Sequence, residues 1–270
     1  MRDYELVLTL NTDEVVRIIP ELRVQFDITK SVKGGLNSCR IKIYNLSADK
    51  RKKLIKDKTD NSIKMPFLFR AGYEKIETIF KGTILEASSV REGVDFVTTI
   101  NCLDGGYDFI NSYTSKTVTN NNIDNLLTDS PNIEKGKITE LKQLFRPRVF
   151  VGKTFKLISD MLAEDETYFI DNEKLHIIKD DEVIDDYIPL IQPSTGLLNT
   201  PVRKNKEVSF STLMNPVVKI GGLVELKSTT AEHLNGVYKV ITIRYSGDNY
   251  GKDWLQECIC QSSKEYKVLK

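Results

Sequence analysis

Long hydrophobic runs, cysteines and a leader segment are what this 270-residue chain has least of. No window approaches the roughly 18 apolar residues that span a bilayer, so we expect no membrane contact. The first residues contain no apolar signal core. The four cysteines are too few for a disulfide framework, and Cys258 and Cys260 on one strand would lie at or beyond bridging distance. Free thiols without a signal peptide predict synthesis and folding in a reducing cytoplasm.

An excess of charge of either sign is also missing, because 39 Lys and Arg face 38 Asp and Glu, a net charge of +1. Proteins that hold nucleic acid need clustered positive charge. We therefore expect no specific nucleic-acid binding, although DNA can pass a neutral surface without sticking to it. Hydrophobic residues at 40% are ordinary for a globular protein, and the length allows one large domain or two to three small ones.

Histidines and nucleotide-binding motifs are scarce as well. The sequence contains neither Gly-x-Gly-x-x-Gly nor Gly-x-x-x-x-Gly-Lys-Ser/Thr, so a nucleotide cradle has no support. The two histidines, His176 and His233, do not stand beside a recognisable nucleophile. We interpret His176 as a structural residue on a short strand and His233 as an exposed residue before the Asn235-Gly236 turn.

Three groups have the residue types of a metal site without its spacing. Cys258-x-Cys260 is not the Cys-x-x-Cys of structural zinc, and we expect both side chains in the core. The acidic run at residues 180–186 lacks the turn glycine of a calcium loop and is interpreted as a solvated connector. Asp248 and Asp253 flank the last hairpin loop, where turn chemistry explains them more simply than a cation does. We expect no catalytic, cofactor-binding or metal-binding residue.

Two basic runs, residues 50–53 and 203–206, are the remaining candidates for an anion site. The first follows Ser47, a helix N-cap type, and we interpret it as the solvated face of a short helix that buries Leu54 and Ile55. The pattern leaves open whether the second run faces a channel or the outside.

Period-two alternation dominates the first hundred residues and predicts antiparallel strands with one buried face. Residues 31–37, with Gly34 and Gly35, predict a hairpin loop. The strands expected from this pattern lie at residues 4–10, 22–28, 39–46, 63–70, 77–87 and 94–103.

The pattern changes near residue 106 and changes back near residue 191. Residues 119–122 are expected to cap a short helix that carries Ile123, Leu126 and Leu127, and a second helix opens at residues 152–154. Two short strands at 168–170 and 174–178 follow. Further strands are expected at residues 207–210, 217–220, 223–226, 237–244 and 254–260. We therefore predict a β-module at residues 1–108, a small α/β insert at 109–190 and a second β-module at 191–270.

Residues 80–102 and 237–260, about 158 positions apart, are weak copies of one another. In each, a strand leads to a polar tip, and the returning strand begins with an aromatic residue and ends with a cysteine. This repeat indicates a duplicated module, which favours assembly over catalysis. We expect Phe96 and Trp254, and likewise Cys102 and Cys260, to be matched core positions that align on superposition of the modules.

Several motifs resemble the baseplate hub proteins of tailed bacteriophages, the late-control D-like hubs. The resemblance covers most of the chain and is thinnest between residues 112 and 150. The motifs that carry it are Phe26-Asp27-Ile28, Arg40-Ile41-Lys42-Ile43-Tyr44-Asn45-Leu46, Ala71-Gly72-Tyr73, Leu103-Asp104-Gly105-Gly106, Leu213-Met214-Asn215-Pro216, Asn235-Gly236, Gly247-Asp248 and Asp253-Trp254.

The resemblance implies a mainly β (β+α) fold with two tube-type antiparallel β-barrel or sandwich modules flanking the α/β insert. It implies a structural, non-enzymatic virion protein of the tail baseplate that is made and assembled in the host bacterial cytoplasm. As a homotrimer it would join the hexameric tail tube to the trimeric central spike and leave a DNA channel. The implied partners are the tail tube protein or tube initiator, the central spike and other baseplate proteins, with no cofactor.

Three other functions remain open on the sequence. One is the equivalent hub of a bacterial contractile injection system. Another is a tail-associated peptidoglycan hydrolase, for which Asp160, Glu164 and Asp165 around the insert helix are the available carboxylates. The third is a free carbohydrate- or peptide-binding β-protein, which would more often expose aromatic residues.

Overall fold

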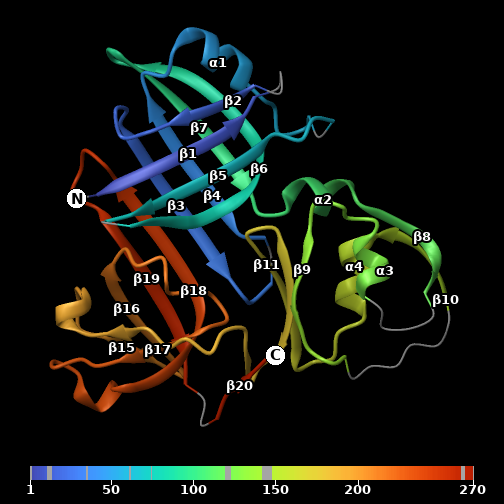
Figure 1. Ribbon diagram of the computed structural model, residues 1–270, viewed down its shortest axis with the longest axis vertical. Coiled ribbons are helices and arrows are strands. Elements are labelled where there is room, and N and C mark those ends of the chain that lie inside the picture. Colours follow the sequence, from blue (N-terminus) through green and yellow to red (C-terminus); the bar gives the residue numbers. More distant parts are fainter. Residues whose placement is uncertain are drawn as a thin grey trace.

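Strands from both ends of the chain form one long sheet (Figure 1). The computed structural model describes residues 2–10, 14–34, 36–60, 62–73, 75–118, 123–141, 148–262 and 265–269. Within these residues the sheet has 13 strands. Its first part contains β1 (Asp3–Thr9), β2 (Val15–Ile18), β3 (Val24–Ser31), β4 (Ser38–Tyr44), β5 (Pro66–Gly72), β6 (Ile76–Glu92) and β7 (Asp95–Leu103).

The second part of the sheet comes from the last eighty residues. It contains β14 (Leu190–Ile191), β15 (Val202–Lys204), β16 (Glu207–Leu213), β17 (Leu223–Leu226), β18 (Gly236–Asp248) and β19 (Trp254–Gln261). Alternate residues along β16 and β19 are buried, as period-two patterns require. The predicted mainly β fold is confirmed.

Five strands in each part have the same connectivity. The order β3-β4-β7-β6-β5 in the first part matches β15-β16-β19-β18-β17 in the second. Both long hairpins, β6–β7 and β18–β19, also carry a register shift at the same place. Ile84 pairs with Cys102 and Val240 with Cys260, and one residue is then skipped before pairing resumes. We call these five-strand units the first and second repeats.

The two repeats join because β18 pairs with two partners along its outer edge. Its first residues, 236–239, pair with β17, whereas residues 242–248 pair with β3 of the first repeat. The change of partner coincides with the register shift at Ile241. A β-bulge bends and twists a strand, which allows β18 to leave one neighbour and meet another.

The insert packs around a hydrophobic cluster of its own, on the right in Figure 1. Strands β11 and β12 turn tightly at Asn172 and Glu173, which both have positive φ. Helix α4 carries Phe155, Leu157 and Ile158 into this cluster. The elements are α2 (Gly106–Asn111), β8 (Tyr113–Val118), α3 (Ile123–Leu127), β9 (Glu134–Ile138), β10 (Arg148–Lys153), α4 (Thr154–Asp160), β11 (Glu166–Asp171) and β12 (Lys174–Lys179). Short strands β13 (Glu182–Val183) and β20 (Lys267–Val268) pair below it.

Two local predictions are wrong. The expected strand at 217–220 is a turn, although Val218 and Ile220 are buried and therefore imitate strand alternation. Ile55 is not buried, because helix α1 (Ala48–Leu54) ends one residue earlier and leaves Ile55 55% exposed. The expected cap at residues 119–122 lies outside the described residues. No helix in the described part of the chain is long and apolar enough to cross a membrane.

Candidate functional site

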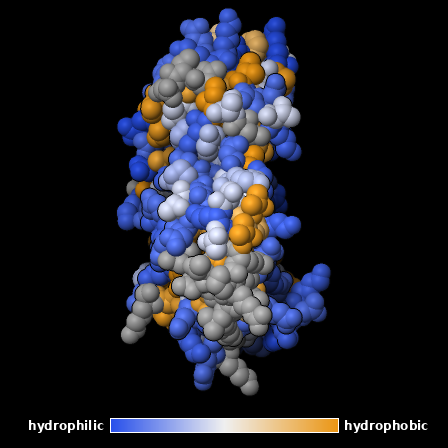
Figure 2. All heavy atoms as spheres, turned by 90° about the vertical axis from the view of Figure 1, so that its right-hand side faces the viewer, coloured by the Kyte–Doolittle hydropathy of each residue, from blue (hydrophilic) through white to orange (hydrophobic). Residues whose placement is uncertain are grey.

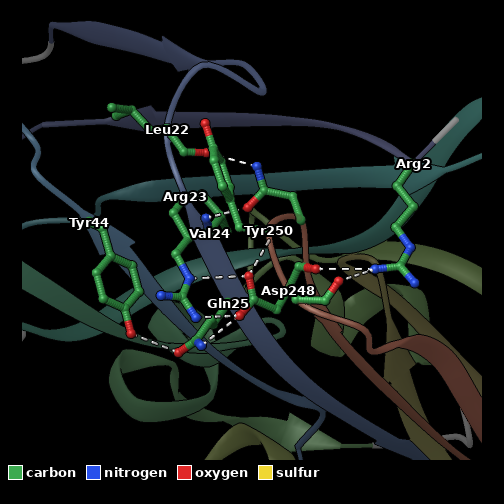
Figure 3. Close-up of polar contacts among 10 residues, drawn as sticks. Arg2, Leu22, Arg23, Val24, Gln25, Tyr44, Asp248 and Tyr250 are labelled. Carbon is green, nitrogen blue, oxygen red and sulfur yellow. Dashed lines mark hydrogen bonds and ion pairs between the residues drawn. The ribbon is translucent and has the colours of Figure 1, made fainter.

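The junction between the two repeats contains Asp248, one of the two carboxylates that the sequence singled out for a possible cation. Arg23 donates to both oxygens of this carboxylate, at 3.3 Å to Oδ1 and 2.7 Å to Oδ2, and Gln25 donates to Oδ2 at 2.8 Å (Figure 3). The backbone N–H of Tyr250 donates to Oδ1 at 3.0 Å. Asp248 is thus surrounded by hydrogen-bond donors, which fixes β18 to the start of β3.

The environment of Asp248 also sets its protonation. Burial alone would raise the pKa of this carboxyl, but the hydrogen bonds from Arg23, Gln25 and the Tyr250 backbone outweigh it and hold the pKa at about 2. Asp253 is exposed, and its backbone carbonyl accepts the Asp248 N–H at 2.9 Å, which closes the loop. The turn interpretation of these two residues therefore agrees with the structure. No group of three or more metal-ligand side chains occurs among the described residues.

The loop that follows Asp248 is held from two sides by residues near the start of the chain. The Asn249 side chain accepts the Val24 N–H at 2.7 Å and donates to the Leu22 carbonyl at 2.9 Å. On the other side, the Arg2 guanidinium donates to the carbonyl of Gly251 at 2.6 Å (Figure 3). Residues more than 220 positions apart thus form one polar contact.

Beneath this polar contact lies an aromatic one. Trp254, 2% exposed, sits edge-on to Phe26 with ring centroids 5.1 Å apart. Its indole N–H donates to the carbonyl of Gly72 at 3.2 Å, and Tyr73 donates its hydroxyl to the Trp254 carbonyl at 3.1 Å. The hairpin tip of the second repeat is therefore buried by the first repeat.

The expectation that Phe96 is a core residue matching Trp254 is wrong. Phe96 is 39% exposed, and the Arg51 guanidinium lies over its ring at 3.6 Å. Cys102 and Cys260 do occupy equivalent buried positions in the two ladders. The difference arises because a neighbouring repeat covers Trp254, whereas the corresponding side of the first repeat is open.

The cysteines and histidines behave as the sequence analysis expected. All four cysteines are free and buried, and burial raises the pKa of the Cys258 thiol to about 12. His176 stacks on Phe169 at 5.0 Å and accepts the Lys137 N–H through Nδ1 at 3.1 Å. Burial lowers the pKa of His176 to about 4. Thiols with a raised pKa stay protonated and are poor nucleophiles.

A second polar centre, which the sequence analysis missed, joins the first repeat to the insert. The Asp104 carboxylate accepts the backbone N–H groups of Asn172 at 2.6 Å and Glu173 at 2.7 Å. Beside it, Lys30 of β3 forms an ion pair of 2.6 Å with Asp171, and both side chains are largely buried. The signal in the sequence was Asp104 between the end of β7 and two glycines.

Burial dominates the protonation of Asp104. Its pKa is raised to about 7 by burial and by the nearby Asp171 charge, while Lys30 and the backbone donors oppose the rise. The polar groups of the centre are satisfied by hydrogen bonds and an ion pair within it. It fixes the position of the insert against the sheet.

The charged runs are also used within the chain. In the connector at 180–186, Asp185 pairs with Lys219 at 3.3 Å, and the buried Lys239 ammonium donates to the carbonyls of Lys179 and Asp180. In the first basic run Lys53 pairs with Glu14 at 2.6 Å. Charges paired in this way are not available for an anion.

Asp160, Glu164 and Asp165, the carboxylates considered for a hydrolase, do not form a cleft. Asp160 and Glu164 are exposed near the end of α4. A cavity of about 870 Å³ opens beside β9 and β12, and its described lining includes His176 but none of the three carboxylates. Figure 2, which views the insert side, shows hydrophobic residues as separate groups on a mostly hydrophilic surface.

The two repeats are joined into one sheet by polar and aromatic contacts between segments far apart in the sequence. The sequence matches the family model described as "Baseplate hub gp41" over residues 5–257, and the chain therefore belongs to this baseplate hub family. The predicted resemblance is confirmed. No curated protein matches the sequence.

Solved structures with the same fold come from phage tails and a secretion system. The 43 kDa tail protein of prophage MuSo2 from Shewanella oneidensis has a TM-score of 0.64 at 9% identity, over 95% of this chain and 98% of the other. A tail protein from Neisseria meningitidis scores 0.65 at 8% identity, over 97% and 98%. The E. coli c3393 protein, a type VI secretion component described as similar to phage T4 gp27 and gp5, scores 0.64 at 6%, over 97% and 79%.

Proposed function

We propose that the protein is the trimeric hub of a phage tail baseplate, which joins a hexameric tail tube to a trimeric central spike and leaves a channel for DNA. One observation carries this proposal, namely the identical strand order of the two repeats within one chain. Three chains would present six similar repeats to the tube and three insert-bearing subunits to the spike. A closed ring of this kind buries complementary surfaces without growing into a filament.

The rest of the molecule fits a mechanical role. The candidate polar centres consist of ion pairs and hydrogen bonds between distant segments, and their acidic and basic groups are satisfied by one another. A net charge of +1 suits a ring through which DNA passes. We propose that the protein is not an enzyme, that its partners are the tube protein or tube initiator, the central spike and other baseplate proteins, and that it assembles in the host cytoplasm.

The equivalent hub of a bacterial contractile injection system is the second candidate. The fold shared with a type VI secretion component favours it. The genes next to the coding sequence distinguish the two, since a phage hub is encoded among capsid and tail genes.

The test is the oligomeric state together with the particle. We expect light scattering to give the mass of three chains for the purified protein alone, or the mass of three chains plus the spike when the central spike is added. Electron microscopy of the intact tail should then place three copies between tube and spike. A chain that stays monomeric in the presence of the spike would contradict the proposal, and turnover of purified cell wall would favour the hydrolase.

A further inference from the structure

The two repeats differ in what covers the tip of the long hairpin. In the second repeat, Trp254 is buried against Phe26 and Gly72 of the first repeat. In the first repeat, Phe96 occupies the corresponding position and is 39% exposed, and Val90 and Val94 beside it are 54% and 87% exposed. A surface that one repeat buries is therefore open and apolar in the other.

The same difference appears in the backbone. Residues 242–248 of β18 pair with β3, and their counterparts in β6 are residues 86–92. Within the described chain, the outer partner of this β6 segment is a single bridge between Ala87 and Lys56, with N···O distances of 2.9 and 3.0 Å. Past Ala87 the outer side of β6 is a short open edge. Open edges are normally covered, twisted away or paired.

The surface that would receive this tip is open as well. In the first repeat the receiving strand is β3, and its counterpart in the second repeat is β15. Strand β15 pairs only with β16 in the described chain, ends the sheet, and exposes all three of its residues, with Val202 58% exposed. The described chain therefore exposes both surfaces of a second repeat-to-repeat contact, the β6–β7 tip and the β15 edge.

We infer that the β6–β7 tip of one copy packs onto the β15 edge of a second copy and repeats there the contact that β18–β19 makes with β3. This inference rests on the proposed hub function and names the contact between its subunits. The β15 edge and the β6–β7 tip of one chain cannot meet, because six strands lie between β15 and β6. At roughly 4.8 Å per strand spacing, the seven spacings between the two strands amount to about 34 Å along the sheet.

The repeat fixes which residues meet. Ser246 pairs with Asp27 in the internal contact. Val90 is the counterpart of Ser246. Each lies six positions after the residue that pairs with the cysteine, which is Ile84 opposite Cys102 or Val240 opposite Cys260. Val202 is the counterpart of Asp27. Following the pairing across two strands leads from Asp27 to Asn101 of β7 and from Val202 to Ile259 of β19. Asn101 and Ile259 are equivalent, since each directly precedes the matching cysteine.

Val90 of one copy is thus placed opposite Val202 of the next. An exposed apolar pair replaces the polar pair of the internal junction. A contact in which two different surfaces meet head to tail generates a ring when its rotation closes. Alternation of the internal junction with this contact makes a ring of repeats.

A double-cysteine variant, Val90→Cys with Val202→Cys, tests the contact directly. Side chains directly opposite on neighbouring strands are close enough for a disulfide. The native cysteines are all buried and do not compete. Under mild oxidation, we expect cross-linked dimers and trimers on a non-reducing gel, with the spike protein added if the chain alone is monomeric. The control pair Val90→Cys with Val149→Cys uses a strand residue that is more exposed than Val202, and it should give no such ladder.

A charge substitution provides the second arm. Val202→Lys should abolish the trimer in light scattering, whereas Val149→Lys should leave it intact, and both variants should fold because the two side chains are exposed. A trimer that forms normally with Val202→Lys and gives no Val90–Val202 cross-link would overturn this contact while the hub function stands. Failure of the unmodified chain to form a trimer with the spike would instead refute the hub function itself.

Discussion

Asp104 shows how a single buried carboxyl couples two parts of this hub protein. It comes from the end of β7 in the first repeat, and its hydrogen-bond donors come from the β11–β12 turn of the insert. Its importance could not be derived from the sequence, because the donors are backbone groups 68 and 69 positions away. The sequence showed only an acid followed by two glycines.

The raised pKa of Asp104 predicts a pH dependence of stability. The folded chain binds this proton with a pKa of about 7, against an ordinary value of 3.8, so the folded state holds more protons between these values. The corresponding stability is present at acid pH and is lost as the pH rises from about 4 towards 7. Asp104→Asn should flatten that fall in the free energy of unfolding, measured by urea denaturation across this range.

His176 acts in the opposite direction, since its lowered pKa removes stability as the pH falls from 6.5 towards 4. The comparison is therefore made between the variant and the unmodified chain at each pH. Asp160→Asn, an exposed carboxyl, is the matched control and should leave the profile unchanged. An identical profile for Asp104→Asn would contradict the assignment.

At the scale of elements, period-two alternation predicted most strands of the two repeats. It succeeded where one face of an antiparallel strand is buried, as in β3 and β4. It failed at residues 217–220, where two buried side chains belong to a turn. The match between the two repeats wrongly placed Phe96 in the core, because the sequence does not reveal which repeat has a neighbour that covers this position. Burial by a distant element overrides a local pattern.

Gly247 permits the close approach of β18 to the aromatic side of the junction. A Cβ added there would lie 2.4 Å from a Phe26 ring carbon and 2.7 Å from Trp254. Gly247→Ala should therefore separate the two rings and cost about 1–3 kcal/mol of stability, as overpacking does in cores. Because Trp254 is the only tryptophan, its fluorescence should shift to the red. Ser246→Ala, on the same strand, should leave the emission unchanged.

At the scale of the whole molecule, the two repeats share one sheet and one hydrophobic cluster that reaches from Tyr4 to Cys260. We expect them to unfold together, because opening either repeat exposes the Phe26–Trp254 contact. Thermal curves followed by tryptophan fluorescence and by far-ultraviolet circular dichroism should coincide. A fluorescence transition well below the dichroism transition would show that the second repeat detaches first.

The bulge at Ile241 has a consequence for the size of the assembly. It is the point at which β18 leaves β17 and meets β3, so it sets the angle between one repeat and the next. Leu85 holds the equivalent position in β6, just before the open edge. If the proposed ring forms and the contact between copies repeats the internal one, each chain contributes two such bends, at Ile241 and Leu85, to the curvature of the ring. The width of the proposed channel would then depend on the backbone at Leu85 and Ile241.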